Sequence, residues 1–269
     1  MLPQAASFLF ALFFLALFAP ANANYKLPKL EIFSAVSFPR LDLRPQASGF
    51  SFDLEVALPP ATSALEPLAT VPIACSVYAG PGGECAAGMV ATAVTYEDCG
   101  NTFDVCRCTD ANMTMDTVVD RLGRVPVGLR RFLGTVLVLG GKTQAYTNLS
   151  TGDVHFFGQC AMETWIHEAA HALDYAIETA PLSNSVGWEK ATLRDSCVPD
   201  NYSLTNQVED FAQMAVIKTY MLLHSGNLPP GFEAACMENQ LAFLNALPVF
   251  NPLTLFGNTC AISAVPDAR

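Results

Sequence analysis

The stretch Trp165-Ile-His-Glu-Ala-Ala-His-Ala-Leu-Asp174 carries the strongest structural signal in this sequence. Its apolar residues recur at helical spacing, and neither Pro nor Gly interrupts residues 161–178, so we expect a buried helix there. His167 and His171 are four residues apart, which places both imidazoles on one face of that helix. This spacing suits two nitrogen ligands of one tetrahedral Zn²⁺ ion.

Glu168 follows the first histidine and completes a His-Glu-x-x-His pattern. A carboxylate at this position can reach a zinc-bound water and act as the general base of a metallopeptidase. The alternative is a chance grouping of polar residues on one helix. The chain has only 4 histidines, however, and unpaired charges on a buried helix would be costly. The pattern therefore predicts a zinc site.

Zinc needs a third protein ligand and an open position for water. The metzincin pattern is excluded, because Asp174 and Ile177 stand where that pattern has Gly and His. Downstream, the run Tyr202-Ser-Leu-Thr-Asn-Gln-Val-Glu-Asp-Phe-Ala-Gln213 leads into a strongly periodic helix. We expect Glu209, near the start of that helix, to be the third ligand. The neighbouring Asp210 would point about 100° away around the helix.

The two segments 165–174 and 202–213 together resemble the catalytic domain of anthrax lethal factor and the related bacterial Pro-Pro endopeptidases, which are gluzincins. The resemblance extends into Met221-Leu-Leu-His-Ser225 and covers roughly the last 120 residues, judged by the order and spacing of the motifs. The cysteines and glycosylation sequons indicate a secreted, fungal branch. The resemblance implies a zincin-like fold, zinc ligands His167, His171 and Glu209, Glu168 as the base, and Tyr202 as the donor that stabilises the oxyanion.

Other polar residues around these motifs leave alternatives open. Gln213 stands where that family usually has a second glutamate; its carbonyl oxygen can hold a ligand histidine without adding charge. Asp174 is either a hydrogen-bond partner behind the metal site or a solvated carboxylate. His155, in an expected strand, either lies along an edge strand that binds extended substrate or is only a strand residue, and the latter is preferred; His224, at a helix end, is assigned a packing role.

The N-terminus predicts secretion. Residues 9–18 form an apolar run without charge, and Ala21-Asn-Ala23 is a small-x-small cleavage site, so residues 1–23 are expected to be a signal peptide. Sequons at Asn112, Asn148 and Asn201 agree with a glycoprotein of the extracellular space. The sequon at Asn201 contains Tyr202, so a glycan there would crowd the mouth of the expected site.

The 9 cysteines are expected to form disulfide bonds outside the cell, with one thiol left over because the count is odd. A pair between Cys160 and Cys197 would tie the metal helix to the Tyr202 segment. Cys106-x-Cys108 does not have the spacing of a zinc knuckle.

Strand patterns precede helical ones along the chain, which indicates an α+β fold. Residues 24–110 are expected to be an N-terminal β and disulfide-rich region, either a subdomain or a propeptide, with a strand around 50–56. Residues 111–269 are expected to form the zincin-like metallopeptidase domain. Within it we predict strands at 134–139 and 153–157 and helices at 114–122, 161–178, 186–194, 207–224 and 232–246.

The formal net charge of −11 argues against nucleic-acid partners and anionic membranes. We expect a monomer that hydrolyses a peptide or protein substrate with Zn²⁺ as its cofactor. The rival is a non-enzymatic secreted binding or surface-coat protein that retains the zincin fold. A third reading is a small effector that acts through the disulfide-rich segment 75–108.

Overall fold

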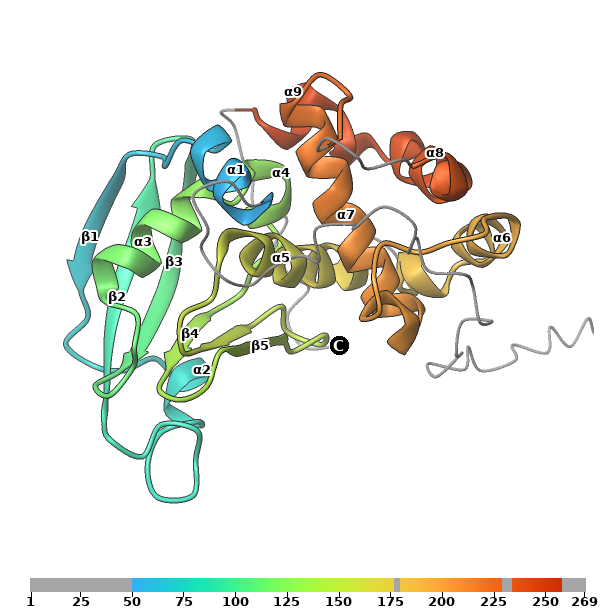
Figure 1. Ribbon diagram of the computed structural model, residues 1–269. Coiled ribbons are helices and arrows are strands. Elements are labelled where there is room, and N and C mark those ends of the chain that lie inside the picture. Colours follow the sequence, from blue (N-terminus) through green and yellow to red (C-terminus); the bar gives the residue numbers. More distant parts are fainter. Residues whose placement is uncertain (1–49, 177–179, 229–233, 258–269) are drawn as a thin grey trace, which may run out of the picture.

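The computed structural model describes residues 50–176, 180–228 and 234–257 (Figure 1). The expected signal peptide, residues 1–23, lies outside this part of the chain. One mixed β-sheet and α1–α4 occupy one side of the molecule, and α6 and α8 occupy the other, with α5 and α7 between them (Figure 1), while α9 packs on α4. The predicted α+β class is confirmed.

The sheet has six strands in the order β1-β2-β3-β4-β6-β5. The first three are antiparallel, β4 pairs in parallel with both β3 and β6, and β5 forms one edge antiparallel to β6. Strands from both sides of residue 110, the expected domain boundary, therefore belong to one sheet. The strands are β1 (Ser63–Pro67), β2 (Met89–Tyr96), β3 (Cys99–Cys108), β4 (Val136–Leu139), β5 (Gln144–Thr147) and β6 (Val154–Phe157).

The helices predicted from periodicity in the second half are present, although α8 begins later than expected, after a 3₁₀ turn at Ala235–Met237. Helix α5 packs on the sheet, where Trp165 stacks on Phe156 of β6 with ring centroids 3.8 Å apart. The helices are α3 (Met115–Arg124), α4 (Val127–Arg130), α5 (Met162–Ala176), α6 (Val186–Arg194), α7 (Gln207–Leu223), α8 (Glu238–Ala246) and α9 (Pro252–Leu255). Within the described residues, no helix is both long enough and apolar enough to cross a membrane.

The strand predicted around residues 50–56 is wrong, because Phe50–Ala57 forms a helix, α1. Phe50, Leu54 and Leu58 follow one another at four-residue spacing and are buried, whereas Phe52 is 40% exposed. The ring of Phe50 stacks on Tyr220 of α7 at 4.6 Å. Burial of a helical stripe therefore outweighs the alternation that suggested a strand.

Disulfide bonds fasten two regions of the described chain. Cys75–Cys106 and Cys85–Cys108 attach the short helix α2 (Ile73–Ser76) and the glycine-rich turn after it to β3. Among the described cysteines, only Cys160 is a free thiol, and it is buried. The conjectured pair between Cys160 and Cys197 is wrong, because Cys197 bonds to Cys236.

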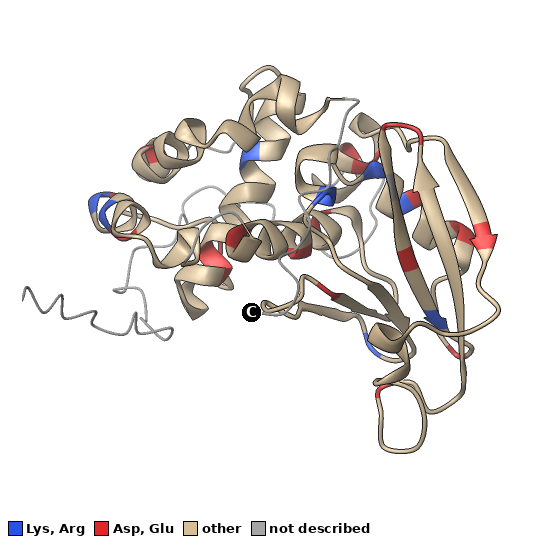
Figure 2. Cartoon of the chain, turned by 180° about the vertical axis from the view of Figure 1, so that it is seen from behind, with Lys and Arg blue, Asp and Glu red and all other residues tan. Residues whose placement is uncertain are grey.

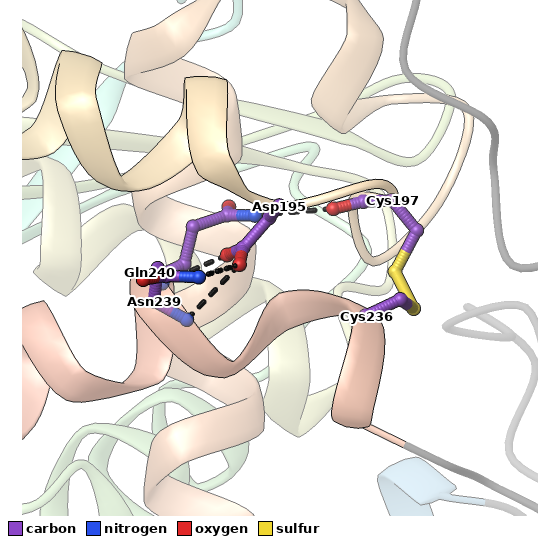
Figure 3. Close-up of a disulfide and its surroundings, with 5 residues drawn as sticks. All are labelled: Asp195, Cys197, Cys236, Asn239 and Gln240. Atoms are coloured by element: carbon purple, nitrogen blue, oxygen red, sulfur yellow. Dashed lines mark hydrogen bonds between the residues drawn. A yellow bond between two sulfur atoms is a disulfide. The ribbon is translucent and has the colours of Figure 1, made fainter.

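The segment that leads from α6 toward α7 is also tied to α8 (Figure 3). Asp195, at the end of α6, accepts hydrogen bonds from the backbone N–H groups of Asn239 and Gln240, at 3.0 and 2.9 Å, in the first turn of α8. These bonds satisfy donors that a helix N-terminus otherwise leaves open. The Cys197–Cys236 disulfide joins the same two segments two residues further on, so the start of the 197–206 loop is fixed.

Candidate metal centre

Three side-chain atoms converge between α5 and α7. Nε2 of His167 lies 3.1 Å, and Nε2 of His171 lies 3.2 Å, from Oε2 of Glu209, and the two nitrogens are 3.0 Å apart. Donor atoms that share one tetrahedral Zn²⁺ ion, each about 2.0–2.1 Å from it, lie about 3.3–3.4 Å from one another. The nearly equilateral triangle is therefore close to the size that one divalent ion requires, and the three residues form a group that could hold a metal ion. We call these three residues the triad.

Local sequence explains where Glu209 stands. The side chain of Asn206 accepts hydrogen bonds from the backbone N–H groups of Val208 and Glu209, at 2.9 and 3.0 Å, and thereby caps α7. Asn is among the preferred residues for this position because its side-chain oxygen replaces the missing carbonyl of a preceding turn. The cap places Glu209 in the first turn of α7, opposite the two histidines of α5.

Gln213, one turn after Glu209, orients His167. Its amide Nε2 donates a hydrogen bond of 2.6 Å to Asp200, so its carbonyl oxygen faces Nδ1 of His167 at 3.1 Å. A protonated Nδ1 that donates to this oxygen leaves the lone pair of Nε2 directed into the triad, as metal ligation requires. The contact that the sequence suggested for Gln213 is present.

Asp174 does not contact the histidines. It is fully buried, and its carboxylate accepts hydrogen bonds from the backbone N–H and the hydroxyl of Ser183, at 2.8 and 2.6 Å. Burial raises the pKa of Asp174 to about 6, although the Ser183 hydrogen bonds act in the opposite direction. Both readings of Asp174 from the sequence are therefore wrong.

Nδ1 of His171 is buried and has no hydrogen-bond partner among the described residues.

The triad favours a positive charge beside Glu209. Burial alone would raise the pKa of Glu209, but hydrogen bonds from His167 and His171 outweigh it and hold the pKa well below its ordinary value. For His171, burial acts to lower the pKa, yet the hydrogen bond to Glu209 and the nearby Glu168 carboxylate raise it overall. A bound cation would supply the same positive charge between these groups.

The two residues predicted to be catalytic lie beside the triad. Oε2 of Glu168 accepts a hydrogen bond of 2.7 Å from the hydroxyl of Thr147 on the edge strand β5. Tyr202 is 51% exposed, and its ring centroid is 5.8 Å from that of His167. Burial of its hydroxyl, followed by the charge of Glu209, raises the pKa of Tyr202 above its ordinary value.

A cavity of about 370 Å³ opens beside the triad, between β5, α5 and the loop before α7. Its lining residues include Glu168, Asp200 and Glu163, whose own carboxylate oxygens are buried, and they include no Lys or Arg. Acidic residues also gather on α5 and the start of α7 in Figure 2. His167 lines this larger cavity, whereas His171 and Glu209 line a smaller cavity of about 100 Å³, and Glu168 and Tyr202 line both. The triad is thus accessible to a small ligand from an acidic cavity.

Asp210 and His155 lie outside the triad. Asp210 is fully buried, and burial raises the pKa of its carboxyl well above the ordinary value. His155 contacts Glu84 at 2.6 Å and stacks on Tyr146, where the glycine-rich turn meets β5 and β6. The rejection of Asp210 as a ligand agrees with this geometry.

Sequence analysis missed two residues that shape the centre, Thr147 and Asp200. Thr147 contacts Glu168 across the gap between the sheet and α5, and Asp200 orients Gln213 from an irregular loop. Neither position belongs to a motif. Only the packing of distant segments brings these side chains to the site.

Comparison with known proteins gives two matches. The family model described as "Conidiation-specific protein Con-13" matches residues 52–247, which include the whole triad. The "Conidiation-specific protein 13" of Neurospora crassa is 31% identical over 159 residues, which are 55% of this chain and 44% of that protein. The match thus spans less than half of the length of this relative. No solved structure matches the chain.

These findings correct the functional prediction. Both matches are to conidiation-specific proteins, with no enzymatic activity indicated, and neither is to a metallopeptidase. The resemblance to anthrax lethal factor and the Pro-Pro endopeptidases is therefore wrong, and so is the prediction of a zinc metalloendopeptidase with Glu168 as its base. The His-Glu-x-x-His pattern describes a local arrangement of ligands, and such an arrangement does not by itself fix a reaction. The family model covers well over half of the sequence, and the chain belongs to the conidiation-specific protein Con-13 family.

Proposed function

We propose that this protein is a secreted, non-enzymatic Zn²⁺-binding protein that uses one open position of a metal centre with two histidine ligands and one glutamate ligand to bind another molecule. The observation that carries the proposal is the convergence of the His167, His171 and Glu209 donor atoms at 3.0 to 3.2 Å from one another. The relative in Neurospora crassa is named for conidiation, and we propose that the present protein acts in the same process.

The donor set favours zinc. Mg²⁺ and Ca²⁺ prefer sites made entirely of oxygen ligands, whereas two imidazole nitrogens and one carboxylate suit Zn²⁺. Structural zinc sites are usually closed by four protein ligands. Among the described residues, only three side chains meet here, and this leaves a fourth position toward the cavity.

The cavity suggests which donors can fill that position. Because Glu168 and Asp200 line it and no Lys or Arg does, an anionic ligand would be repelled by these carboxylates. A neutral donor such as an imidazole, an amine or a carbonyl avoids that repulsion. We therefore propose a ligand that approaches the metal with a neutral nitrogen or oxygen atom.

Secretion is part of the proposal. The disulfides at Cys75–Cys106, Cys85–Cys108 and Cys197–Cys236 are typical of proteins from oxidising compartments. The apolar run and cleavage site near the N-terminus support the same compartment.

Cobalt substitution tests this function. Co²⁺ gives an absorption spectrum that reports its coordination. We expect wild-type protein and Glu168→Gln to bind Co²⁺ and Zn²⁺ competitively, because Glu168 is not in the triad. Glu209→Ala should lose the metal. Imidazole should change the spectrum of the Co²⁺ protein at lower concentration than acetate does. Failure of wild-type protein to bind either ion, or a spectrum that no small ligand alters, would overturn the proposal.

A further inference from the structure

The loop before α7 carries the sequon Asn201-Tyr202-Ser203 at the rim of the cavity. Asn201 is exposed, and the residues on both sides of it, Asp200 and Tyr202, line the cavity. A group attached to Asn201 would therefore stand beside the entrance to the metal centre. This sequon is the one sequence motif next to the triad that metal binding does not explain.

Local hydrogen bonds form a turn around the exposed Asn201. Oδ1 of Asp200 accepts hydrogen bonds from the backbone N–H and the hydroxyl of Ser203, at 2.9 and 3.1 Å. This turn buries Ser203 and leaves Asn201 and Tyr202 exposed. No hydrogen bond joins the Asn201 side chain to any other described residue. The folded loop can therefore carry a large substituent on this amide without losing a contact.

The other two sequons differ from this one. The amide oxygen of Asn148 accepts hydrogen bonds from the N–H and the hydroxyl of Ser150, at 3.1 and 2.7 Å, and the residue is half-buried. Asn112 is exposed, but its amide oxygen accepts a hydrogen bond from Gly141, and it does not line either cavity. Of the three sequon asparagines, only Asn201 both lacks a side-chain hydrogen bond to another described residue and lies next to residues that line the larger cavity.

We propose that Asn201 carries an N-linked glycan, and that this glycan limits the open metal position to small ligands. In the attachment step, Nδ2 of Asn201 attacks C1 of an oligosaccharide linked to a lipid diphosphate. The N–C1 bond forms, the C1–O bond to phosphate breaks, and the lipid diphosphate leaves while the amide loses one proton. The restricting role rests on the proposed secretion and metal binding.

The size of the cavity agrees with this role. A volume of about 370 Å³ is at the lower end of the range for small-molecule sites, roughly 300–1,000 Å³. Tyr202 is 51% exposed, so the protein itself leaves this side of the cavity open to solvent. A glycan on the adjacent residue would cover that side and still let a small donor pass.

The experiment uses the full chain, secreted by a eukaryotic host. Enzymatic release of N-glycans in H₂¹⁸O, followed by peptide mass spectrometry, should mark Asn201 as glycosylated. Asn201→Gln should abolish that mark, and Ser203→Thr, which keeps the sequon, should retain it. An unmodified Asn201 in secreted wild-type protein would overturn the proposal, whatever the metal content.

The restricting role is measured on the Co²⁺ protein with two probes, free imidazole and imidazole coupled to dextran. We expect Asn201→Gln to bind the dextran-linked probe several-fold more tightly than wild type, with unchanged affinity for free imidazole. Asn112→Gln is the matched control and should behave as wild type. Equal affinities of wild type and Asn201→Gln for the large probe would reject the restricting role. Loss of metal binding in all variants would instead reject the proposed function, while glycosylation is decided separately.

Discussion

Both ring nitrogens of His167 have a defined environment, and this sets the chemistry of the triad. Gln213 faces Nδ1, and Asp200 fixes the orientation of the Gln213 amide at 2.6 Å. Partners of this kind typically change metal affinity by about 10- to 100-fold when they are removed. The sequence indicated the role of Gln213 because the residue lies one helical turn after Glu209. Asp200 lies outside the helix, so no helical spacing relates it to the ligands.

We expect Gln213→Leu to lower Zn²⁺ affinity by about 10- to 100-fold, because His167 loses the acceptor that fixes its tautomer. Gln213→Glu keeps an acceptor for Nδ1 of His167 but replaces the donor to Asp200 with a second carboxylate, so its affinity should exceed that of Gln213→Leu without exceeding that of wild type. Competition with a chromophoric chelator measures both variants. Unchanged affinity in Gln213→Leu would show that Gln213 does not orient the ligand.

Asp174 predicts a pH dependence of stability. Burial raises its folded-state pKa from 3.8 to about 6, so the folded protein binds this proton more tightly than the unfolded chain. The resulting stabilisation is complete below about pH 4 and is lost as the pH rises through 6, with a magnitude of about 2–3 kcal/mol. In Asp174→Asn this dependence is absent.

Urea denaturation of wild type and Asp174→Asn at pH 4 and pH 7 measures this pH dependence of stability. Relative to wild type, the variant should gain about 2–3 kcal/mol of unfolding free energy between the lower and the higher pH. A difference between the two proteins that is the same at both pH values would contradict the assignment.

At the scale of elements, periodicity predicted the two helices that form the site. Helices α5 and α7 are long, uninterrupted and buried, and these properties make a helical pattern easy to detect. In α1 the short sequence from Phe50 to Val56 fits a strand and a helix equally well. Its contact with Tyr220 of α7 selected the helix, and sequence spacing alone does not contain that contact.

The cap of α7 links helix stability to metal binding. Asn206→Ala removes the acceptor for the backbone N–H groups of Val208 and Glu209, and we expect a loss of about 1 kcal/mol in unfolding free energy. The same change should weaken Zn²⁺ binding, because Glu209 lies in the first turn. Asn206→Ser, which can still cap the helix, is the control. If Asn206→Ala lowers stability but leaves metal affinity unchanged, the first turn of α7 does not position the ligand.

At the scale of the whole molecule, the disulfides and the sheet connect segments that sequence analysis had assigned to different regions or had not paired. The sheet runs through strands on both sides of residue 110, since β3 pairs with β4. The Cys197–Cys236 bond spans all of α7 and closes the loop that carries Glu209. Neither feature could be predicted, because disulfide pairing and strand order depend on contacts between distant residues.

Removal of the Cys197–Cys236 bond tests the contribution of that loop. The double variant Cys197→Ser/Cys236→Ser should lose about 2–4 kcal/mol of unfolding free energy, since its unfolded state regains freedom over a sequence separation of 39 residues. Thermal or urea unfolding measures this loss. Cys160→Ser, at the buried free thiol, is a single-site control that breaks no disulfide. A double variant as stable as wild type would contradict this role.

The His-Glu-x-x-His motif of this protein predicts local geometry but not a reaction. The spacing of His167, Glu168 and His171 gave the correct local geometry, because helical register alone determines it. The reaction did not follow from that geometry, and the family to which the chain belongs indicates none. The residues form a triad that could hold a metal ion, and the proposed ligand binding requires that ion.

The most direct test is the zinc content of secreted, purified protein after dialysis, measured by inductively coupled plasma mass spectrometry. We predict one zinc ion per chain in wild type and in Glu168→Gln, and almost none in Glu209→Ala or His167→Ala. Wild-type protein that holds no divalent metal after zinc addition, or Glu209→Ala with its full complement, would contradict the metal centre described here.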